Sequence, residues 1–260
     1  SVITVTYTIT PKLAGCADGA PVVTTVQIEP TPQASLNNLA PVICNAGNAN
    51  IQVSSPTTPT TAGNLMFDIA VASTNGPATG GTAFTALNNQ TFPFTINGSL
   101  TNSSNDDITV TFTITPKLAG CSSGPVQIAN VVVEPTPSVV VVNNVPTICD
   151  GGTPDFDITS LTVPSIPANL TFDIAVSLPP GVSGTGIAGS GVNGVAAPFS
   201  FNAGTLTNAA TSSRTVVYTI TPKLNGCANG ASQVVNVVVE PTPQVSLTNN
   251  LAKICNNGTP

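Results

Sequence analysis

Apolar and polar residues alternate in one short stretch of the chain that occurs three times, and only Val217 in the third copy breaks the alternation. In its second copy, threonines separate Val110, Phe112 and Ile114. An alternation with a period of two is typical of a β-strand that buries one face and exposes the other. We therefore expect the threonines to face solvent and the apolar members to be buried; these are Val5, Tyr7 and Ile9, then Val110, Phe112 and Ile114, then Val216, Tyr218 and Ile220.

Further short strands are predicted on both sides of this stretch. A Ser-Ser-Gly-Pro turn follows Cys121 and leads into an apolar segment at 126–133, which should pair antiparallel with the strand before the turn. Earlier in the chain, the segments 51–54, 65–71 and 92–96 have the composition of strands. No useful window shows the 3.6-residue period of a helix, so the sequence predicts an all-β fold.

Three motifs divide the chain into repeats of about 105 residues. Tyr-Thr-Ile-Thr-Pro-Lys-Leu-Ala-Gly-Cys at 7–16 returns with few changes 105 and then 106 residues later, and Glu-Pro-Thr-Pro and Ile-Cys recur at the same spacing. This period is the size of one immunoglobulin-like β-sandwich. The predicted organisation is an elongated rod of tandem sandwiches, with the end of one repeat at 1–30, whole repeats at 31–135 and 136–241, and the start of another at 242–260.

The composition excludes most functional classes. The chain has no His and no Trp, and charged residues make up 6% of it. Without His neither a Ser-His-Asp triad nor an imidazole-bound zinc site can form, so we expect no enzyme activity and no cofactor. Five basic residues against eleven acidic ones give a net charge of −6, which argues against nucleic acid as a partner. No apolar stretch reaches the roughly 20 residues that cross a membrane, so no membrane insertion is expected.

The combination of motifs resembles a known repeat family. Each Ile-Cys at 43–44 and 148–149 is followed by Gly two or three positions after the Cys, and the last strand of each repeat closes on Glu-Pro-Thr-Pro. These motifs are similar to those of the PKD-like repeats of Bacteroidota surface proteins, which occur in very long gliding adhesins of the SprB type, exported by the type IX secretion system. The resemblance covers the whole chain. It implies stalk repeats of an extracellular adhesin or filament, which give reach and stiffness for surface attachment or gliding.

Two candidate ligand sites are weak. The segment 184–189 (Gly-Thr-Gly-Ile-Ala-Gly) fits the dinucleotide pattern G-x-G-x-x-G, but no helix signal follows it, so we expect a flexible loop. Asp150, Asp155 and Asp157 could supply oxygen ligands for calcium, whereas the preceding repeat has neutral Asn residues in this region. Because a repeat-wide site would need acids in every copy, no metal is predicted and the three Asp residues are a weak calcium candidate.

Recurring charges and prolines mark the joints between repeats. The sandwich topology puts the recurring Lys near one pole of a repeat and the recurring Glu at the opposite pole. In repeats stacked end to end, Glu29 should approach Lys117 and Glu134 should approach Lys223, as exposed salt bridges worth about 0–1 kcal/mol. Prolines limit bending because they restrict their own backbone and the residue before them; the joint prolines are Pro30, Pro32, Pro135, Pro137, Pro241 and Pro243.

The six cysteines suit an oxidising compartment. Pairing Cys44 with Cys121 conflicts with the sandwich topology, because the two lie at opposite poles and a disulfide needs Cα atoms within about 7 Å. Pairing Cys16 with Cys44 requires the chain to fold back at the proline joint and stays open, as do free thiols. The favoured bond joins successive repeats through Cys44 and Cys227. The other cysteines would then bond to repeats beyond this chain; they are Cys16, Cys121, Cys149 and Cys255.

A carbohydrate-binding or other ligand-binding module is the alternative function. Sugar sites commonly stack on aromatic side chains, whereas this chain has two Tyr, nine Phe and no Trp. Tyr7 and Tyr218 lie on the apolar side of their strands, which favours a place in the core. The expected partners are neighbouring repeats of the same chain, other copies in a filament, and an unidentified surface or glycan target.

Overall fold

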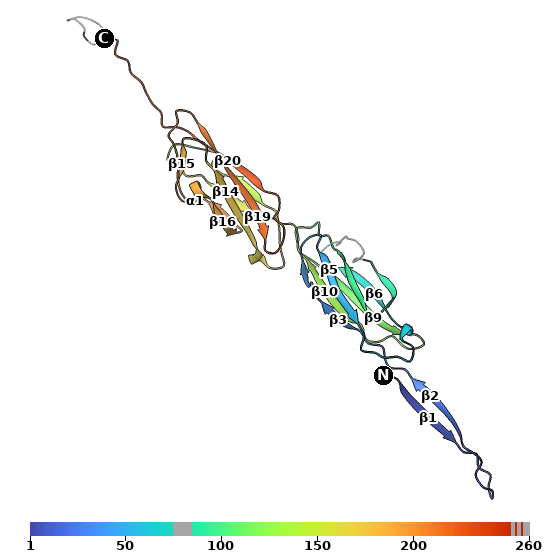
Figure 1. The fold of residues 1–260 in the computed structure, drawn as a ribbon. Coiled ribbons are helices and arrows are strands. Elements are labelled where there is room, and N and C mark those ends of the chain that lie inside the picture. Colours follow the sequence, from blue (N-terminus) through green and yellow to red (C-terminus); the bar gives the residue numbers. More distant parts are fainter. Residues whose placement is uncertain (75–84, 251–252, 254–255, 257–260) are drawn as a thin grey trace. The chain divides into compact units, whose positions relative to one another are not determined.

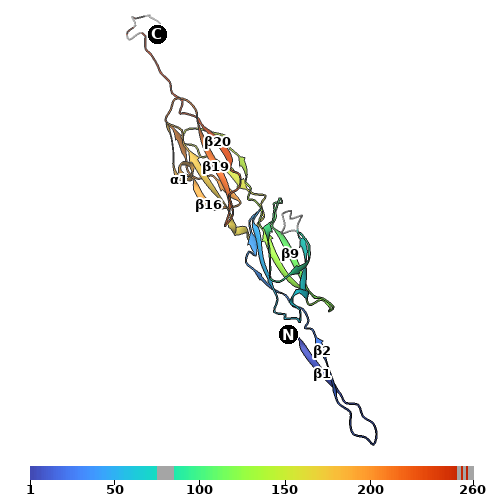
Figure 2. The ribbon, with the colours of Figure 1, turned by 45° about the vertical axis from the view of Figure 1, so that its right-hand side comes forward.

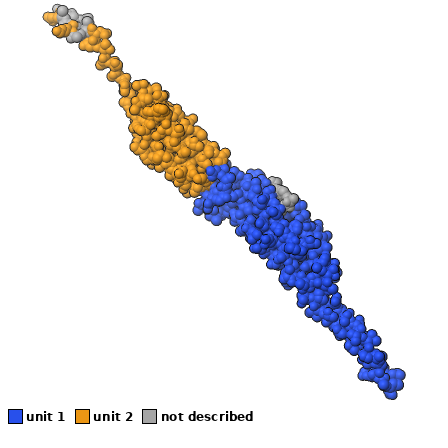
Figure 3. All heavy atoms as spheres, in the orientation of Figure 1, with its two compact units in different colours: residues 1–137, 161–170, 224–229 blue, residues 138–160, 171–223, 230–260 orange. Residues whose placement is uncertain are grey.

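The computed structural model describes residues 1–74, 85–250, 253 and 256, and nearly all of its regular structure is β-strand (Figure 1). The chain divides into two compact units, coloured separately in Figure 3. Unit 1 consists of Ser1–Pro137, Leu161–Leu170 and Leu224–Asn229. Unit 2 consists of Ser138–Ser160, Thr171–Lys223 and Gly230–Pro260. Two short segments that belong by sequence to the repeat 136–241 are thus part of unit 1.

A sandwich of two sheets forms most of unit 1. One sheet has the strand order β4-β10-β9-β6-β7 and the other has the order β3-β5-β8. All neighbouring strands are antiparallel except β4, which runs parallel to β10. Buried side chains from both sheets make one hydrophobic core. The elements are β3 (Ser35–Asn38), β4 (Val42–Ile43), β5 (Asn48–Ser54), the short 3-10 helix η1 (Ala62–Asn64), β6 (Leu65–Ser73), β7 (Leu87–Thr91), β8 (Phe94–Ser99), β9 (Ile108–Leu118) and β10 (Gln127–Val133).

The repeat 136–241 has the same sheet topology as the repeat 31–135. Its larger sheet has the order β12-β20-β19-β14-β16, its smaller sheet the order β11-β13-β17, and β15 and β18 make an additional pair. Both repeats are therefore immunoglobulin-like β-sandwiches, as the sequence predicts. The elements are β11 (Val140–Asn143), β12 (Thr147–Ile148), β13 (Phe156–Thr159), the 3-10 helix η3 (Pro167–Asn169), β14 (Leu170–Ser177), β15 (Val182–Gly184), α1 (Gly186–Ser190), β16 (Val192–Ala196), β17 (Phe199–Phe201), β18 (Leu206–Asn208), β19 (Arg214–Leu224) and β20 (Gln233–Val239).

The predicted register of the alternating strand is confirmed in both whole repeats. Val110, Phe112 and Ile114 are fully buried in β9, while the threonines between them are partly exposed. Their counterparts in β19 are also fully buried; these are Val216, Tyr218 and Ile220. The next strand pairs antiparallel with this one, as predicted, in β9–β10 and in β19–β20. The period of two thus fixes which face of the larger sheet meets the core.

The strand that begins each repeat is broken and changes sheet. β3 pairs with β5 in the smaller sheet, whereas β4 pairs with β10 in the larger one. Pro41 lies between them and has no N–H to continue a ladder, but its carbonyl accepts a hydrogen bond from Val132 N at 2.9 Å. The side chain of Asn38 accepts from the N–H of Ala40 and supports the turn. The same break separates β11 from β12.

The N-terminal part of the chain is a two-stranded hairpin, β1 (Ile3–Ile9) and β2 (Val22–Ile28). Figures 1 and 2 show the two strands side by side. Tyr7 and Ile9 are 51% and 61% exposed in β1, and Val5 is only partly buried, so the prediction that these three side chains are buried is wrong for this copy. The motifs of this hairpin match those of β9 and β10, but among the described residues β1 and β2 form a two-stranded sheet of their own, and nearly all of their residues are exposed.

The segment 184–189 is not the helix-free loop that the sequence predicts. β15 ends at Gly184 and α1 begins at Gly186, with Gly189 packed so closely on Gly184 that a Cβ at either position would clash with the other's backbone. The glycines therefore serve a tight strand-to-helix contact, and the helix has five residues. It also gives the buried Tyr218 hydroxyl an acceptor, the carbonyl of Ala188 at 2.9 Å, while burial raises the pKa of Tyr218.

Candidate functional site

A disulfide joins Cys44 to Cys227, which are 183 positions apart in the sequence and have Cα atoms 5.5 Å apart. Both cysteines belong to unit 1. This is the pairing that the sequence favours over Cys16–Cys44 and Cys44–Cys121. Cys16, Cys121 and Cys149 are exposed free thiols, and Cys255 lies outside the described residues. We call the region around the bond the junction; it comprises Cys44, Glu134 and the segments 161–170 and 224–229.

The turn that carries Cys227 follows directly from the recurring Leu-x-Gly-Cys motif. After β19 ends at Leu224, the N–H of Cys227 donates to the carbonyl of Leu224 at 2.9 Å. Gly226 has a φ of 79°, a left-handed conformation that residues with a side chain rarely adopt. The N–H of Asn225 donates to the carbonyl of Asn169 at 3.1 Å and ties this turn to the segment 161–170. The sequence motif is thus a turn that presents a cysteine at its surface.

The turn that carries Cys44 depends on the glycine three residues later. Gly47 N donates to the carbonyl of Cys44 at 2.8 Å. A Cβ at position 47 would lie only 2.8 Å from that carbonyl oxygen, so the turn closes because no side chain is present. Gly152 makes the same bond to the carbonyl of Cys149 in the next repeat. The Gly of the Ile-Cys motif therefore shapes the backbone that positions the thiol.

Glu134 holds the segment 161–170 at the junction by hydrogen bonds rather than by a salt bridge. Its carboxylate accepts from the backbone N–H of Ser165 at 3.1 Å and from the Ser165 hydroxyl. Glu29 accepts in the same way from the N–H of Thr60, at 3.1 and 3.2 Å. Thr60 and Ser165 are separated by 105 residues, as are Glu29 and Glu134. Each Glu therefore reaches the repeat that follows it, but its partner is a serine or threonine in a loop.

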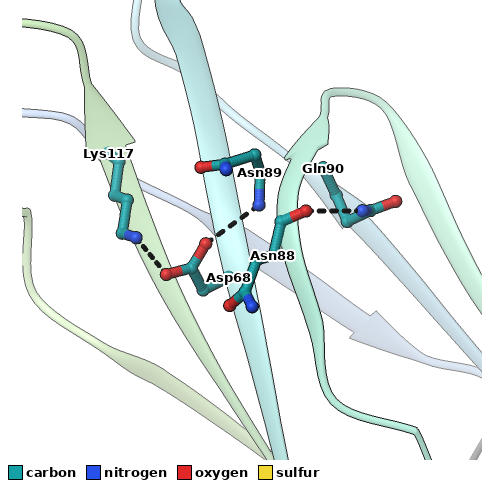
Figure 4. A network of polar contacts seen from close by, with 5 residues as sticks. All are labelled: Asp68, Asn88, Asn89, Gln90 and Lys117. Atoms are coloured by element: carbon teal, nitrogen blue, oxygen red, sulfur yellow. Dashed lines mark hydrogen bonds and ion pairs between the residues drawn. The ribbon is translucent and has the colours of Figure 1, made fainter.

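The predicted salt bridges Glu29–Lys117 and Glu134–Lys223 are wrong. Lys117 forms an ion pair with Asp68 in the same sheet, and Lys223 pairs with Asp173. Figure 4 shows the Lys117 ammonium and the backbone N–H of Asn89 on the two oxygens of Asp68. The reason is the alternation itself, because it turns Lys117 in β9 outward onto the sheet surface beside β6. The Lys117 ammonium, followed by that N–H, lowers the pKa of Asp68.

A crevice of about 570 Å³ lies at the junction, lined mainly by apolar groups such as those of Val42, Ile166 and Leu224. Within the junction, two backbone hydrogen bonds connect the segment 161–170 to the sandwich. Val163 N donates to the carbonyl of Asn105 at 2.8 Å, and Asp107 N donates to the carbonyl of Val163 at 3.1 Å. Covalent, backbone and side-chain contacts thus hold the two segments onto the sandwich within unit 1.

The proline joints lie in different surroundings. Pro135 and Pro137 are buried on either side of the exposed Thr136, whose hydroxyl accepts from the side-chain amide of Asn45 at 2.8 Å. Pro32 is buried and packs so closely on Gly124 that a Cβ there would meet its carbonyl at 1.7 Å. Pro30 and Pro241 are partly buried, and Pro243 is exposed.

A buried asparagine connects each joint to the cysteine turn. Asn102 donates from its side chain to the carbonyls of Asp106 and Val133, both at 2.8 Å, and accepts from Ser104. Its backbone N–H donates to the side chain of Asn45 at 2.8 Å. Asn208 occupies the corresponding place in the next repeat and is 3% exposed. This network was not foreseen from the sequence, although a polar residue recurring at the same place in both copies could have indicated it.

The three Asp residues of the calcium candidate take part in separate hydrogen bonds. Asp150 replaces Asn45 and accepts from the N–H of Asn208 and the hydroxyl of Thr242, which lower its pKa, the hydroxyl more strongly. Asp155 and Asp157 both accept from the side chain of Asn144. Within the described part of the chain, no group of three His, Cys, Asp or Glu side chains is arranged to hold a metal ion. The Asp150 carboxylate thus has a structural use at the joint.

One family model matches part of the chain, within the repeat 136–241 and the joint that follows it. Residues 147–243 match the model of the PKD-like domain. The repeat 31–135 shares the sheet topology and the sequence motifs of the repeat 136–241. The chain matches no curated protein. Among the described residues, no helix is long and apolar enough to cross a membrane.

Several solved structures are similar at low identity. The adhesin FdeC of Escherichia coli is 14% identical, with 92% of this chain and 74% of that chain covered and a TM-score of 0.41. The alpha-2-macroglobulin of E. coli is 11% identical, with 85% and 18% covered and a TM-score of 0.31. The fibronectin(III)-like modules of Clostridium thermocellum CbhA are 10% identical, with 83% and 100% covered and a TM-score of 0.29. At these identities and TM-scores the likenesses carry no argument about function.

Replacing Asn102 with Ala should destabilise unit 1 by about 1–3 kcal/mol, because buried carbonyl and N–H groups lose their hydrogen-bond partners. The free energy of unfolding, obtained from urea titration followed by circular dichroism, measures this. Asn88→Ala is the control, since Asn88 is exposed. Equal stability of the two variants would contradict the role given to the network.

Replacing Lys117 with Met should raise the pKa of Asp68 toward its ordinary value. Because the folded-state pKa is depressed, the ion pair stabilises the fold above the ordinary Asp pKa of about 4, and this contribution is lost as the pH falls through the lowered value. The pair is partly exposed, so the loss at neutral pH should stay below about 1 kcal/mol. Carboxyl NMR titration measures the shift. Lys223→Met should leave Asp68 unchanged, and an unshifted Asp68 in Lys117→Met would contradict the pairing.

Proposed function

We propose that these are structural stalk repeats of a long, secreted cell-surface adhesin or extracellular filament, arranged end to end as a stiff rod. The Cys44–Cys227 disulfide is the observation that carries this proposal. It joins a cysteine of the repeat 31–135 to a cysteine of the repeat 136–241. Domains connected by a linker alone move relative to one another by default. A second covalent connection between successive repeats limits that motion.

The contacts around the bond support the same role. Glu134 accepts two hydrogen bonds from Ser165, and Val163 pairs with the backbone on both sides of Asp106. Pro135 and Pro137 are buried and restrict the backbone where the two repeats meet in the sequence. Each of these contacts is modest alone. Together with the disulfide they act on one short stretch of chain, which supports a joint of low flexibility.

The recurrence of the contacts supports an array. Glu29 meets Thr60 as Glu134 meets Ser165, so two successive joints use the same side-chain arrangement. Cys121 and Cys149 occupy the positions of Cys227 and Cys44 in their own repeats and are exposed and free in this chain. We propose that the free cysteines bond to equivalent cysteines of further repeats, each pair spanning two repeats as Cys44 and Cys227 do.

The cellular setting of the proposal rests on chemistry and on resemblance. Structural disulfides persist in oxidising surroundings, which supports an extracellular location. The match of residues 147–243 to the PKD-like domain, together with the motifs shared with gliding adhesins, supports surface attachment or gliding as the process and type IX secretion as the route. The absence of His from the sequence supports a role without catalysis.

Small-angle X-ray scattering of the unreduced chain tests the stalk function. The parent protein should scatter as a stiff elongated particle, because the disulfide restricts the joint. Cys44→Ser and Cys227→Ser should each give a more flexible particle with a broader distance distribution. Cys149→Ser is the matched control, since Cys149 is the same residue of the next repeat and is free.

A parent protein as flexible as Cys44→Ser would contradict the stalk function. A glycan array tests the alternative function, a carbohydrate-binding module. Specific binding of one sugar class by the parent chain would favour a carbohydrate-binding module instead.

A further inference from the structure

We propose that the Cys44–Cys227 disulfide carries tension past both hydrophobic cores, an inference that rests on the proposed stalk function. A stalk is pulled along its length whenever its tip is attached and its base moves. Tension that enters from the N-terminal side reaches Cys44 and can cross directly to Cys227. The residues between them then form a closed loop that bears no load while the bond is intact.

The enclosed loop contains nearly all of the folded structure. Cys44 follows β4 and Cys227 precedes β20, so β5 to β19 lie inside the loop, and β1 to β4 and β20 lie outside it. Phe67 and Phe112 of one core and Phe172 and Tyr218 of the other are enclosed, and all four are fully buried. The side chains that stabilise the two sandwiches are therefore mainly those that tension does not reach.

Reduction of the bond would change where the load acts. In the reduced chain, tension must pass from β4 into β5 and onward through every enclosed strand to β19. Each strand is held by backbone hydrogen bonds and apolar packing, which yield to a sustained pull far more readily than a covalent bond. The disulfide thus replaces a mechanical path through two sandwiches with a path through one S–S bond.

The cysteine spacing extends this load path along an array. Cys16 precedes Cys44 by 28 residues, and Cys227 precedes Cys255 by the same number. If every such cysteine were bonded as Cys44 and Cys227 are, one disulfide would span two repeats, of 105 and 106 residues. Tension would then pass through only 28 residues of backbone for each such pair of repeats. From Cys16 to Cys44 these residues include β2, β3 and β4, whose backbone is already extended. Little length would then be released under load.

Single-molecule force spectroscopy on the full chain, held by handles at its two ends, tests the inference. The unreduced parent should release a contour length shorter by about 600–660 Å than the same chain in dithiothreitol, because 183 residues extend to about 3.3–3.6 Å each. Cys44→Ser should release the full length without reductant. Cys149→Ser should keep the short length of the parent. Thiol labelling before stretching reports whether Cys44 is bonded.

Two outcomes would overturn the inference. One is an unreduced parent that releases the same length as Cys44→Ser, and the other is a labelled, and therefore free, Cys44. These outcomes are distinguishable from failure of the stalk function. A chain that releases the short length but scatters as a flexible particle would retain the load path and lose the stiff rod. A chain that scatters as a stiff rod but releases the full length would retain the stalk function and lose the load path.

Discussion

The closure of a 183-residue loop by one disulfide is the constraint on which the junction depends. For the bond to form, Cys44 must stand at the end of β4 and Cys227 must stand at a turn just beyond β19. The first condition follows from the parallel pairing of β4 with β10, and the second from the left-handed Gly226. The β4–β10 pairing and the turn at Gly226 are far apart in the sequence, yet the disulfide depends on the geometry of both.

The two repeats form the same hydrogen-bonding arrangement at the joint with different residues. At the joint, the side chain bonded to the threonine of Glu-Pro-Thr-Pro is Asn45 in one copy and Asp150 in the next. Both also accept from the backbone of a buried asparagine. A carboxylate and an amide can exchange here because each accepts from a backbone N–H, while the threonine hydroxyl can either donate or accept. The acid that suggested calcium is therefore explained by its hydrogen bonds.

Local pattern and topology predicted most of the fold and the disulfide. The alternation around Phe112 fixed the buried face, and the poles of a sandwich favoured Cys227 over Cys121 as the partner of Cys44. Three features depended on spatial neighbours that the local sequence pattern does not reveal. The partner of Lys117 follows from the register of β9 against β6, which sets Asp68 beside it. The break between β3 and β4 depends on Pro41, and the exposure of Tyr7 follows from the two-stranded sheet that β1 and β2 form by themselves.

Peptide mapping of the unreduced protein tests the central claim most directly. Proteolysis with free thiols blocked, followed by mass spectrometry, identifies which cysteine peptides are linked. The account predicts one linked pair that contains Cys44 and Cys227, which reduction separates. A peptide linking Cys44 to Cys16 or to Cys121 would contradict it.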